Sequence, residues 1–210
     1  DQIVEILERA GVKRIYGIVG DSLNPITDAL RKKKTIEWIH VRHEEAAAFA
    51  ASAEAQLSGN LAVCCGSSGP GNLHLINGLF DAHRSHAPVL AIASDIPQSQ
   101  IGLEYFQATH PEQLFRECSS YAELISEGSQ APRILMSAIQ HAWARRDVGV
   151  VVLPGDIADA PAEMEDLVHL PSYTREHVVP EHESLSLLAR MFDEHRRITC
   201  LLYTSPSPRD

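Results

Sequence analysis

The chain has 210 residues, 44% of them hydrophobic, and a formal net charge of -10 from 28 acidic and 18 basic residues. This length is enough for one well-packed core and the beginning of a second. The acidic balance, with Lys32-Lys33-Lys34 as the only run of three basic residues, argues against nucleic acid as the main partner. The four cysteines include no C-x-x-C pair, which indicates a reduced, cytoplasmic chain without a disulfide framework.

Helix-like and strand-like segments alternate regularly along the first three quarters of the chain. The expected helices are 3–10, 22–31, 44–57, 71–83, 112–117 and 129–144, and the expected strands are 14–18, 36–41, 61–65, 89–93, 121–125 and 149–153. The strand at 89–93 is apolar throughout, as is typical of a strand buried on both faces. This alternation predicts right-handed βαβ units and therefore an α/β fold: a doubly wound, flavodoxin-like parallel sheet with helices on both faces.

A change of composition marks the end of this domain, which we place at 1–160. Scattered prolines predict a linker over 161–180. Residues 181–199 contain an amphipathic helix and then a strand from Ile198, the start of a truncated second domain of the flavin-binding type. Residues 200–210 complete no element; they look like non-native read-through of a sequencing adapter, with a genuine disordered tail as the alternative. We therefore expect the chain to be part of a longer protein.

Four loops are expected at the carboxyl ends of the strands, where doubly wound sheets bind ligands. They are 17–22, 42–45, 66–72 and 94–97. The loop at 66–72 is rich in glycine, but it matches neither G-x-x-x-x-G-K-[ST] nor G-x-G-x-x-G and contains no Lys or Arg. It is either a plain tight turn or a loop whose glycines let a flat, neutral group approach the backbone.

Glu44 opens a helix made almost entirely of small residues. Such a helix can pack closely against its neighbours, so its first turn can be enclosed, and an enclosed Glu can take part in proton chemistry. The simpler interpretation is an acid placed at a helix N-terminus for the dipole, and Asp21 could similarly be an N-cap. The pairs His40/His43 and His83/His86 have no obvious third ligand nearby, so no metal site is predicted.

Together, the loops resemble a known family. Gly17-Ile18-Val19-Gly20-Asp21-Ser22, Arg42-His43-Glu44-Glu45-Ala46-Ala47 and Ser67-Ser68-Gly69-Pro70-Gly71-Asn72 look like the N-terminal pyrimidine-binding domain of thiamine-diphosphate enzymes. The segments 71–81, 106–111 and 150–156 narrow the likeness to bacterial pyruvate oxidases and quinone-dependent pyruvate dehydrogenases.

The resemblance implies a role for each matching residue. Glu44 is the catalytic residue: it hydrogen-bonds the pyrimidine N1′ of thiamine diphosphate and favours the tautomer that removes the thiazolium C2 proton. The other implied cofactor-binding residues are Val19, Gly20, Ser67, Pro70 and His74. The substrate side is formed by Asp21, Phe106 and Gln107.

The resemblance also implies parts that this sequence does not contain. Mg²⁺ and FAD are expected through other domains, since no Gly-Asp-Gly motif occurs here. A second subunit of a homo-oligomer completes the site, and pyruvate is the substrate, oxidised and decarboxylated to acetate and CO2. Any membrane contact, peripheral at the inner membrane, is expected through a C-terminal region outside this sequence. The alternatives are an acetolactate synthase, another 2-keto acid decarboxylase, or a non-catalytic flavodoxin-like binding module.

Overall fold

The computed structural model describes residues 1–161 and 179–199. The chain divides into two compact units, 1–173 and 174–210. The predicted linker lies almost wholly, and the predicted read-through tail entirely, outside the described residues.

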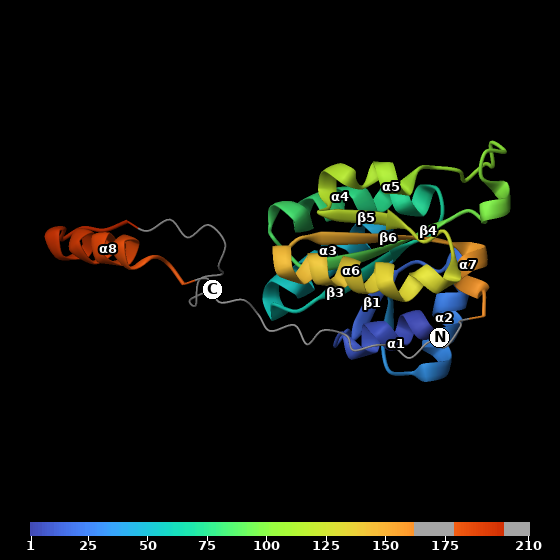
Figure 1. The fold of residues 1–210 in the computed structure, drawn as a ribbon, viewed down its shortest axis with the longest axis horizontal. Coiled ribbons are helices and arrows are strands. Elements are labelled where there is room, and N and C mark those ends of the chain that lie inside the picture. Colours follow the sequence, from blue (N-terminus) through green and yellow to red (C-terminus); the bar gives the residue numbers. More distant parts are fainter. Residues whose placement is uncertain (162–178, 200–210) are drawn as a thin grey trace. The chain divides into compact units, whose positions relative to one another are not determined.

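The first unit is built on one six-stranded sheet in which every strand pair is parallel (Figure 1). The strands are β1 (Arg14–Gly17), β2 (Glu37–His40), β3 (Ala62–Gly66), β4 (Val89–Asp95), β5 (Tyr121–Leu124) and β6 (Val148–Pro154). Their order across the sheet is β2-β1-β3-β4-β6-β5. The predicted doubly wound α/β fold is confirmed.

Seven α-helices and four 3-10 turns connect the strands in the described part of this unit. The helices are α1 (Gln2–Arg9), α2 (Asn24–Lys33), α3 (Glu44–Ser58), α4 (Pro70–Arg84), α5 (Pro111–Leu114), α6 (Ala131–Arg145) and α7 (Gly155–Asp159). The 3-10 turns are η1 (Asp21–Leu23), η2 (Gln98–Gln100), η3 (Arg116–Cys118) and η4 (Gly128–Gln130).

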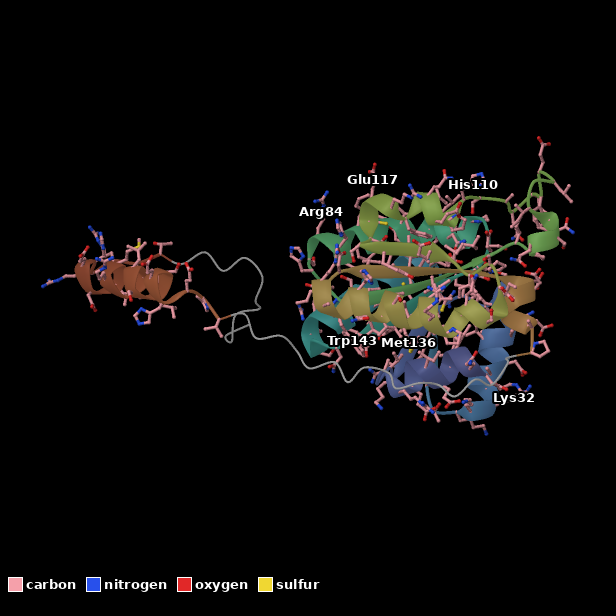
Figure 2. All side chains as sticks on the ribbon, viewed as in Figure 1. Lys32, Arg84, His110, Glu117, Met136 and Trp143 are labelled. Carbon is pink, nitrogen blue, oxygen red and sulfur yellow. The ribbon has the colours of Figure 1, made fainter. Side chains whose placement is uncertain are left out.

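Two hydrophobic clusters, one on each face of the sheet, form the core. One cluster joins α1, α2 and α6 to the sheet, and the other joins α3, α4 and the α5–η3 segment to its opposite face. The neighbours Cys64 and Cys65 belong to different clusters because successive side chains of a strand point to opposite faces. Figure 2 shows Met136 and Trp143 on α6, with Arg84 on α4 toward the other side of the sheet.

The chain changes direction across the sheet between β1 and β3. From β1 the chain goes to β2 on one side, and β3 then pairs with β1 on the other side. Such a reversal leaves a crevice at the carboxyl ends of the two strands, where ligands of this fold class bind. The loops after β1 and β3 therefore flank the expected position of a site.

The two central helices of one face approach each other very closely. Ala47, Ala48, Ala51 and Ala55 of α3 are all fully buried. A Cβ atom added to Gly78 of α4 would lie 2.5 Å from the Ala48 Cβ. The expected close packing of the small-residue helix is confirmed, and this packing brings the first turns of α3 and α4 together.

Two predicted helices differ in the structure. The helix expected at 22–31 starts as the 3-10 turn η1 and becomes α-helical only at Asn24, with Pro25 in its first turn, where a missing N–H costs nothing. The helix expected at 112–117 is split at Phe115 into α5 and the 3-10 turn η3; the φ of -93° and ψ of 0° of Phe115 lie at the edge of the right-handed helical region.

The described part of the second unit contains α8 (His182–Glu194). Its apolar side chains Leu185, Leu188 and Phe192 are about half exposed, at 45%, 46% and 51%. Ile198 and Thr199 are not in a strand, and the rest of the strand expected from Ile198 lies outside the described residues. Among the described helices, none has the length and apolar character needed to cross a membrane.

Candidate functional site

Glu44 is the first residue of α3, and its backbone position follows from the local sequence. His43, in extended conformation, is the N-cap, and its Nδ1 accepts a hydrogen bond from the Glu45 backbone N–H at 3.3 Å. Glu44 is only 7% exposed, even though it lies at the end of a helix. The expected enclosure of this carboxylate in the first turn is confirmed.

Two histidines surround the Glu44 carboxylate. His74 of α4 places its Nδ1 3.0 Å from Glu44 Oε2, so the two groups share a hydrogen bond. The rings of His43 and His74 stack with their centroids 4.2 Å apart. The His43 and His74 side chains are 48% and 43% exposed, so the buried carboxylate lies beside half-exposed imidazoles.

Small residues let the backbone come very close to this carboxylate. A Cβ added at Gly71 would lie 3.3 Å from Glu44 Oε1 and 2.9 Å from Ser67 Oγ. A Cβ added at Gly20 would lie 2.8 Å from the Ser67 Cβ. The glycines thus allow the loops after β1 and β3 to approach each other closely beside Glu44. No hydrogen bond among the described residues engages Oε1.

Hydrogen bonds tie the glycine-rich loop to two other segments. The Ser68 backbone N–H donates to Ser22 Oγ at 3.1 Å, and Ser68 Oγ donates to Gln107 Oε1 at 3.3 Å. Gly69 has a φ of +70°, and a Cβ there would meet the Gln107 backbone. Gln107 therefore packs directly on the loop that leads into α4.

The remaining predicted site residues are spread around this centre. Val19 is 53% exposed beside Gly20, and Pro70 is exposed at the start of α4, as expected for a proline in a first turn. Phe106 is 83% exposed, and its ring packs on Tyr105 with the centroids 4.9 Å apart.

Asp21 lies at a cavity that is apart from Glu44. It makes no capping hydrogen bond, so the alternative of an N-cap is wrong. It lines a cavity of about 340 Å³ whose lining does not include Glu44. The lining residues are Asp21, Asn24, Pro25, Asp28, Gly155 and Asp159.

The carboxyl end of β4 contributes a buried acid. Asp95 is 5% exposed, and burial raises its pKa above the usual 3.8, while the hydrogen bond from the Ile96 N–H (2.8 Å) acts in the opposite direction. Nearby, Asn72 donates to the Ser94 backbone carbonyl at 2.6 Å and links α4 to β4. This edge of the sheet is therefore held by polar contacts within the protein.

The group of His43, Glu44 and His74 was not found from the sequence. One potential ligand atom from each residue lies within 4.8 Å of the other two. Histidine spacing along the chain could not reveal this group, because His74 is 30 residues from Glu44 and joins it only through the packing of α4 on α3.

The fold and the site together define a class of protein. The class is a doubly wound α/β domain with an enclosed carboxylate near the switch between β1 and β3, where ligands of this fold class bind.

Comparisons with known proteins identify the family. Residues 1–114 match the model of the thiamine pyrophosphate enzyme N-terminal TPP-binding domain. The chain therefore belongs to the thiamine-diphosphate-dependent enzyme family, of which it contains the N-terminal cofactor-binding domain.

Individual relatives agree with this assignment. The chain is 56% identical over 202 residues (96% of the chain, 51% of the relative) to an uncharacterized 42.6 kDa protein in the isoamylase 3′ region of Pseudomonas amyloderamosa. It is 38% identical over 164 residues to pyruvate oxidase of Lactiplantibacillus plantarum (77% and 27%). It is 33% identical over 201 residues to a chloroplastic acetolactate synthase 3 of Brassica napus (94% and 31%). The chain thus spans about half the length of the first of these relatives and about a third or less of the other two.

Proposed function

We propose that this chain is the pyrimidine-binding part of a thiamine-diphosphate- and FAD-dependent pyruvate:quinone oxidoreductase, which converts pyruvate to acetate and CO2. The observation that carries the proposal is the Glu44 carboxylate, which is nearly buried and held by His74 through Oε2, while no hydrogen bond among the described residues engages Oε1. A carboxyl group presented in this way suits a ring nitrogen that must gain and lose a proton.

The residues present fit the aminopyrimidine ring of the cofactor. Gly20 and Gly71 carry no side chains, so the backbone at these positions can approach a flat group closely, and exposed Val19 offers apolar surface beside it. Ser67 and Pro70 complete the proposed pocket. When bound, thiamine diphosphate supplies a thiazolium carbon that adds to the keto carbon of the substrate and accepts the electron pair released with CO2.

Within this pocket, each side chain of the chain has its own task. Glu44 Oε1 holds the proton at the pyrimidine N1′. His74 restrains the carboxylate by its hydrogen bond to Oε2, and it is a positioning residue in this proposal. Gln107, tied to Ser68, and exposed Phe106 and Asp21 face the substrate side.

The choice of pyruvate oxidation over other reactions rests on sequence likeness. The segments 71–81 and 106–111 resemble pyruvate oxidases, and a relative with the name pyruvate oxidase is 38% identical over 164 residues. The second candidate is acetolactate synthesis, favoured by the longer match of 201 residues to an acetolactate synthase. A non-catalytic binding module is a poorer fit, because it has no need for an enclosed acid.

Other parts of the site are proposed to come from elsewhere in a longer protein. The glycine-rich loop 66–72 contains no Lys or Arg for a diphosphate, so Mg²⁺, the diphosphate and FAD would bind to other domains, and a second subunit would complete the site. We assign 1–160 to the pyrimidine domain and 181–199 to the start of the middle domain, consistent with the exposed apolar side chains of α8. We place the enzyme in the cytoplasm, with any contact to the inner membrane made by its C-terminal region.

The proposal is tested by Glu44→Gln in the longer protein that contains this chain. Loss of a positioned acid–base group should slow C2-proton exchange of bound thiamine diphosphate by about 10²–10⁴-fold, measured by quenched deuterium exchange. The matched control is Glu45→Gln, one residue along the same helix, whose carboxylate instead accepts from Asn77. An unchanged exchange rate in Glu44→Gln would contradict the proposal and would mean that Glu44 only stabilises the N-terminus of α3.

A second expectation concerns the 210 residues alone. Because the groups for the diphosphate and Mg²⁺ are proposed to lie elsewhere, the isolated chain should release no CO2 from pyruvate when thiamine diphosphate and Mg²⁺ are added. Release of ¹⁴CO2 from labelled pyruvate by the purified chain would contradict the division of the site between domains.

A further inference from the structure

We propose that His43, Glu44 and His74 form a binding site for a divalent transition-metal ion of the zinc type. The three residues come from the N-terminus of α3 and from α4, and one ligand atom of each lies within 4.8 Å of the other two. Two imidazoles and one carboxylate are a usual set of three protein ligands for zinc, with the fourth position left to water.

The geometry needs only a small adjustment to hold such an ion. Zinc bonds of about 2.0–2.1 Å at tetrahedral angles place ligand atoms about 3.4 Å apart. His74 Nδ1 and Glu44 Oε2 are already 3.0 Å apart, so an ion can enter between them with little movement. The His43 side chain is 48% exposed and lies stacked on His74. Its Nδ1 accepts from the Glu45 N–H at 3.3 Å, so His43 can bind the ion through Nε2 with the cap kept, or through Nδ1 if the ring turns and the cap is lost.

Charge and exposure both favour a cation at this place. The Glu44 carboxylate is 7% exposed, and the Glu45 carboxylate lies 3.8 Å from His43 Nδ1. The positive end of the α3 dipole opposes a cation, but the two carboxylates of the first turn offset it. The nitrogen ligands select zinc-type ions over Mg²⁺, which prefers oxygen ligands and keeps much of its water.

The site has a consequence that rests on the proposed function. An ion on Glu44 occupies the carboxylate that the pyrimidine N1′ needs. Zinc and the cofactor should therefore exclude each other, and zinc should block the proposed enzyme reversibly. The metal site itself does not depend on that function, because it is defined only by the three side chains.

The test measures zinc affinity of the untagged 210-residue chain by competition with a chromophoric chelator. We expect one zinc per chain, and no displacement of it by millimolar Mg²⁺. His43→Asn and His74→Asn should each weaken zinc binding by at least about 10-fold. Changing a residue that only hydrogen-bonds a metal ligand already costs about 10–100-fold in affinity, so losing a ligand should cost no less. Both variants should fold. In His43→Asn the new residue is a good N-cap for α3, and in His74→Asn the amide keeps a hydrogen-bond donor for Glu44.

The matched control is His40→Asn, which removes an exposed histidine three residues before His43. This variant should bind zinc with the same affinity as the unchanged chain. X-ray absorption at the zinc edge should show two imidazole nitrogens at about 2.0–2.1 Å. Absence of tight binding in the unchanged chain, or equal affinity in His43→Asn and His74→Asn, would overturn the proposal.

A separate measurement distinguishes this site from the proposed function. In the longer protein, zinc should raise the concentration of thiamine diphosphate needed for half-maximal C2-proton exchange, and His43→Asn should remove that effect. If the chain binds zinc through the three residues but the cofactor does not compete, the metal site stands and the assignment of Glu44 to the pyrimidine fails.

Discussion

At the residue scale, two acids of this chain illustrate how position decides chemistry. Glu44 is only 7% exposed, and its Oε2 lies 3.0 Å from the Nδ1 of His74. Asp95 is similarly enclosed, and its Oδ1 accepts a hydrogen bond from the Ile96 N–H. The two carboxylates therefore differ in the partner that holds them: a half-exposed imidazole for Glu44, and the backbone of the next residue for Asp95.

Asp95 makes the stability of the sheet depend on pH. Burial raises its native pKa above the usual 3.8, so from about that pH upward the native state binds more protons than the unfolded state. The stability contributed at Asp95 is therefore lost as the pH rises from about 3.8 through the raised native pKa. Asp95→Asn keeps the acceptor for the Ile96 N–H and removes the charge. The free energy of unfolding of this variant should equal that of the unchanged chain below pH 3.8 and exceed it above the raised native pKa.

Urea unfolding followed by tryptophan fluorescence, between about pH 4 and pH 7, measures this difference. Trp38 and Trp143 are the only tryptophans of the chain, and both belong to the unit with the sheet. Asp156→Asn is the control, because exposed Asp156 has a similar bond to the next backbone N–H (3.0 Å). A stability gain of Asp95→Asn that is the same at every pH would contradict the burial argument.

At the scale of elements, the pair α3 and α4 determines the site. Each helix contributes one side of the His74–Glu44 contact, and their axes can approach only because Gly78 faces Ala48. Ser52 Oγ, which is fully buried, donates to Asp81 Oδ2 at 2.7 Å across the same contact and keeps the helices in register. The small residues noted in the sequence therefore serve the position of Glu44 as well as the core.

Gly78→Ala tests this close approach. The new Cβ would lie 2.5 Å from the Ala48 Cβ and 2.7 Å from the Phe49 backbone N, and neither atom can rotate away. Overpacking costs about 1–3 kcal/mol, whereas alanine gains about 1 kcal/mol of helix propensity over glycine. Because neither atom can move aside, we expect a cost in the upper half of that range, about 2–3 kcal/mol, and therefore a net loss of about 1–2 kcal/mol in the free energy of unfolding, measured by urea denaturation.

The control for this change is Gly128→Ala, where an added Cβ meets nothing within 4 Å. That variant should unfold at nearly the same urea concentration as the unchanged chain. A Gly78→Ala variant as stable as the unchanged chain would mean that α3 and α4 are farther apart than described.

At the scale of the whole molecule, the central strands of the sheet are sealed from solvent. Cys64 and Cys65 of β3 and Cys118 of η3 are fully buried. Burial raises the pKa of the Cys64 and Cys118 thiols to about 12, and that of Cys65 well above 9.0. Alkylation requires an accessible thiolate, so these thiols should react only when the sheet opens.

This expectation is checked with iodoacetamide and peptide mass spectrometry. At about pH 8, the peptides with the three buried cysteines should stay unmodified in the native chain and become modified in urea. Alkylation of Cys64 at the same rate in both conditions would show that the core is more open than its burial indicates.

The fold was largely predictable because its signals are local. Each strand and helix shows a hydrophobic pattern that repeats every few residues, and the alternation of strands with helices predicts the parallel sheet. The split of the helix expected at 112–117 was not predictable in this way, because Phe115, where α5 gives way to the 3-10 turn η3, is fully buried in a core that only tertiary packing forms. The alternative of Asp21 as an N-cap was wrong because Asp21 is itself the first residue of η1, whose N-cap is Gly20, and α2 begins only at Asn24.

By itself, the sequence determined the α/β architecture, the loops at one edge of the sheet and Glu44 as an acid in a small-residue helix. Only the tertiary structure decided that His74 shares a hydrogen bond with Glu44 and that His43 stacks on His74. It also decided that Asp21 lines a cavity whose lining does not include Glu44. The reason is physical: periodicity and turn residues act between neighbours in the chain. The distance between α3 and α4 depends instead on how two surfaces of small side chains fit together.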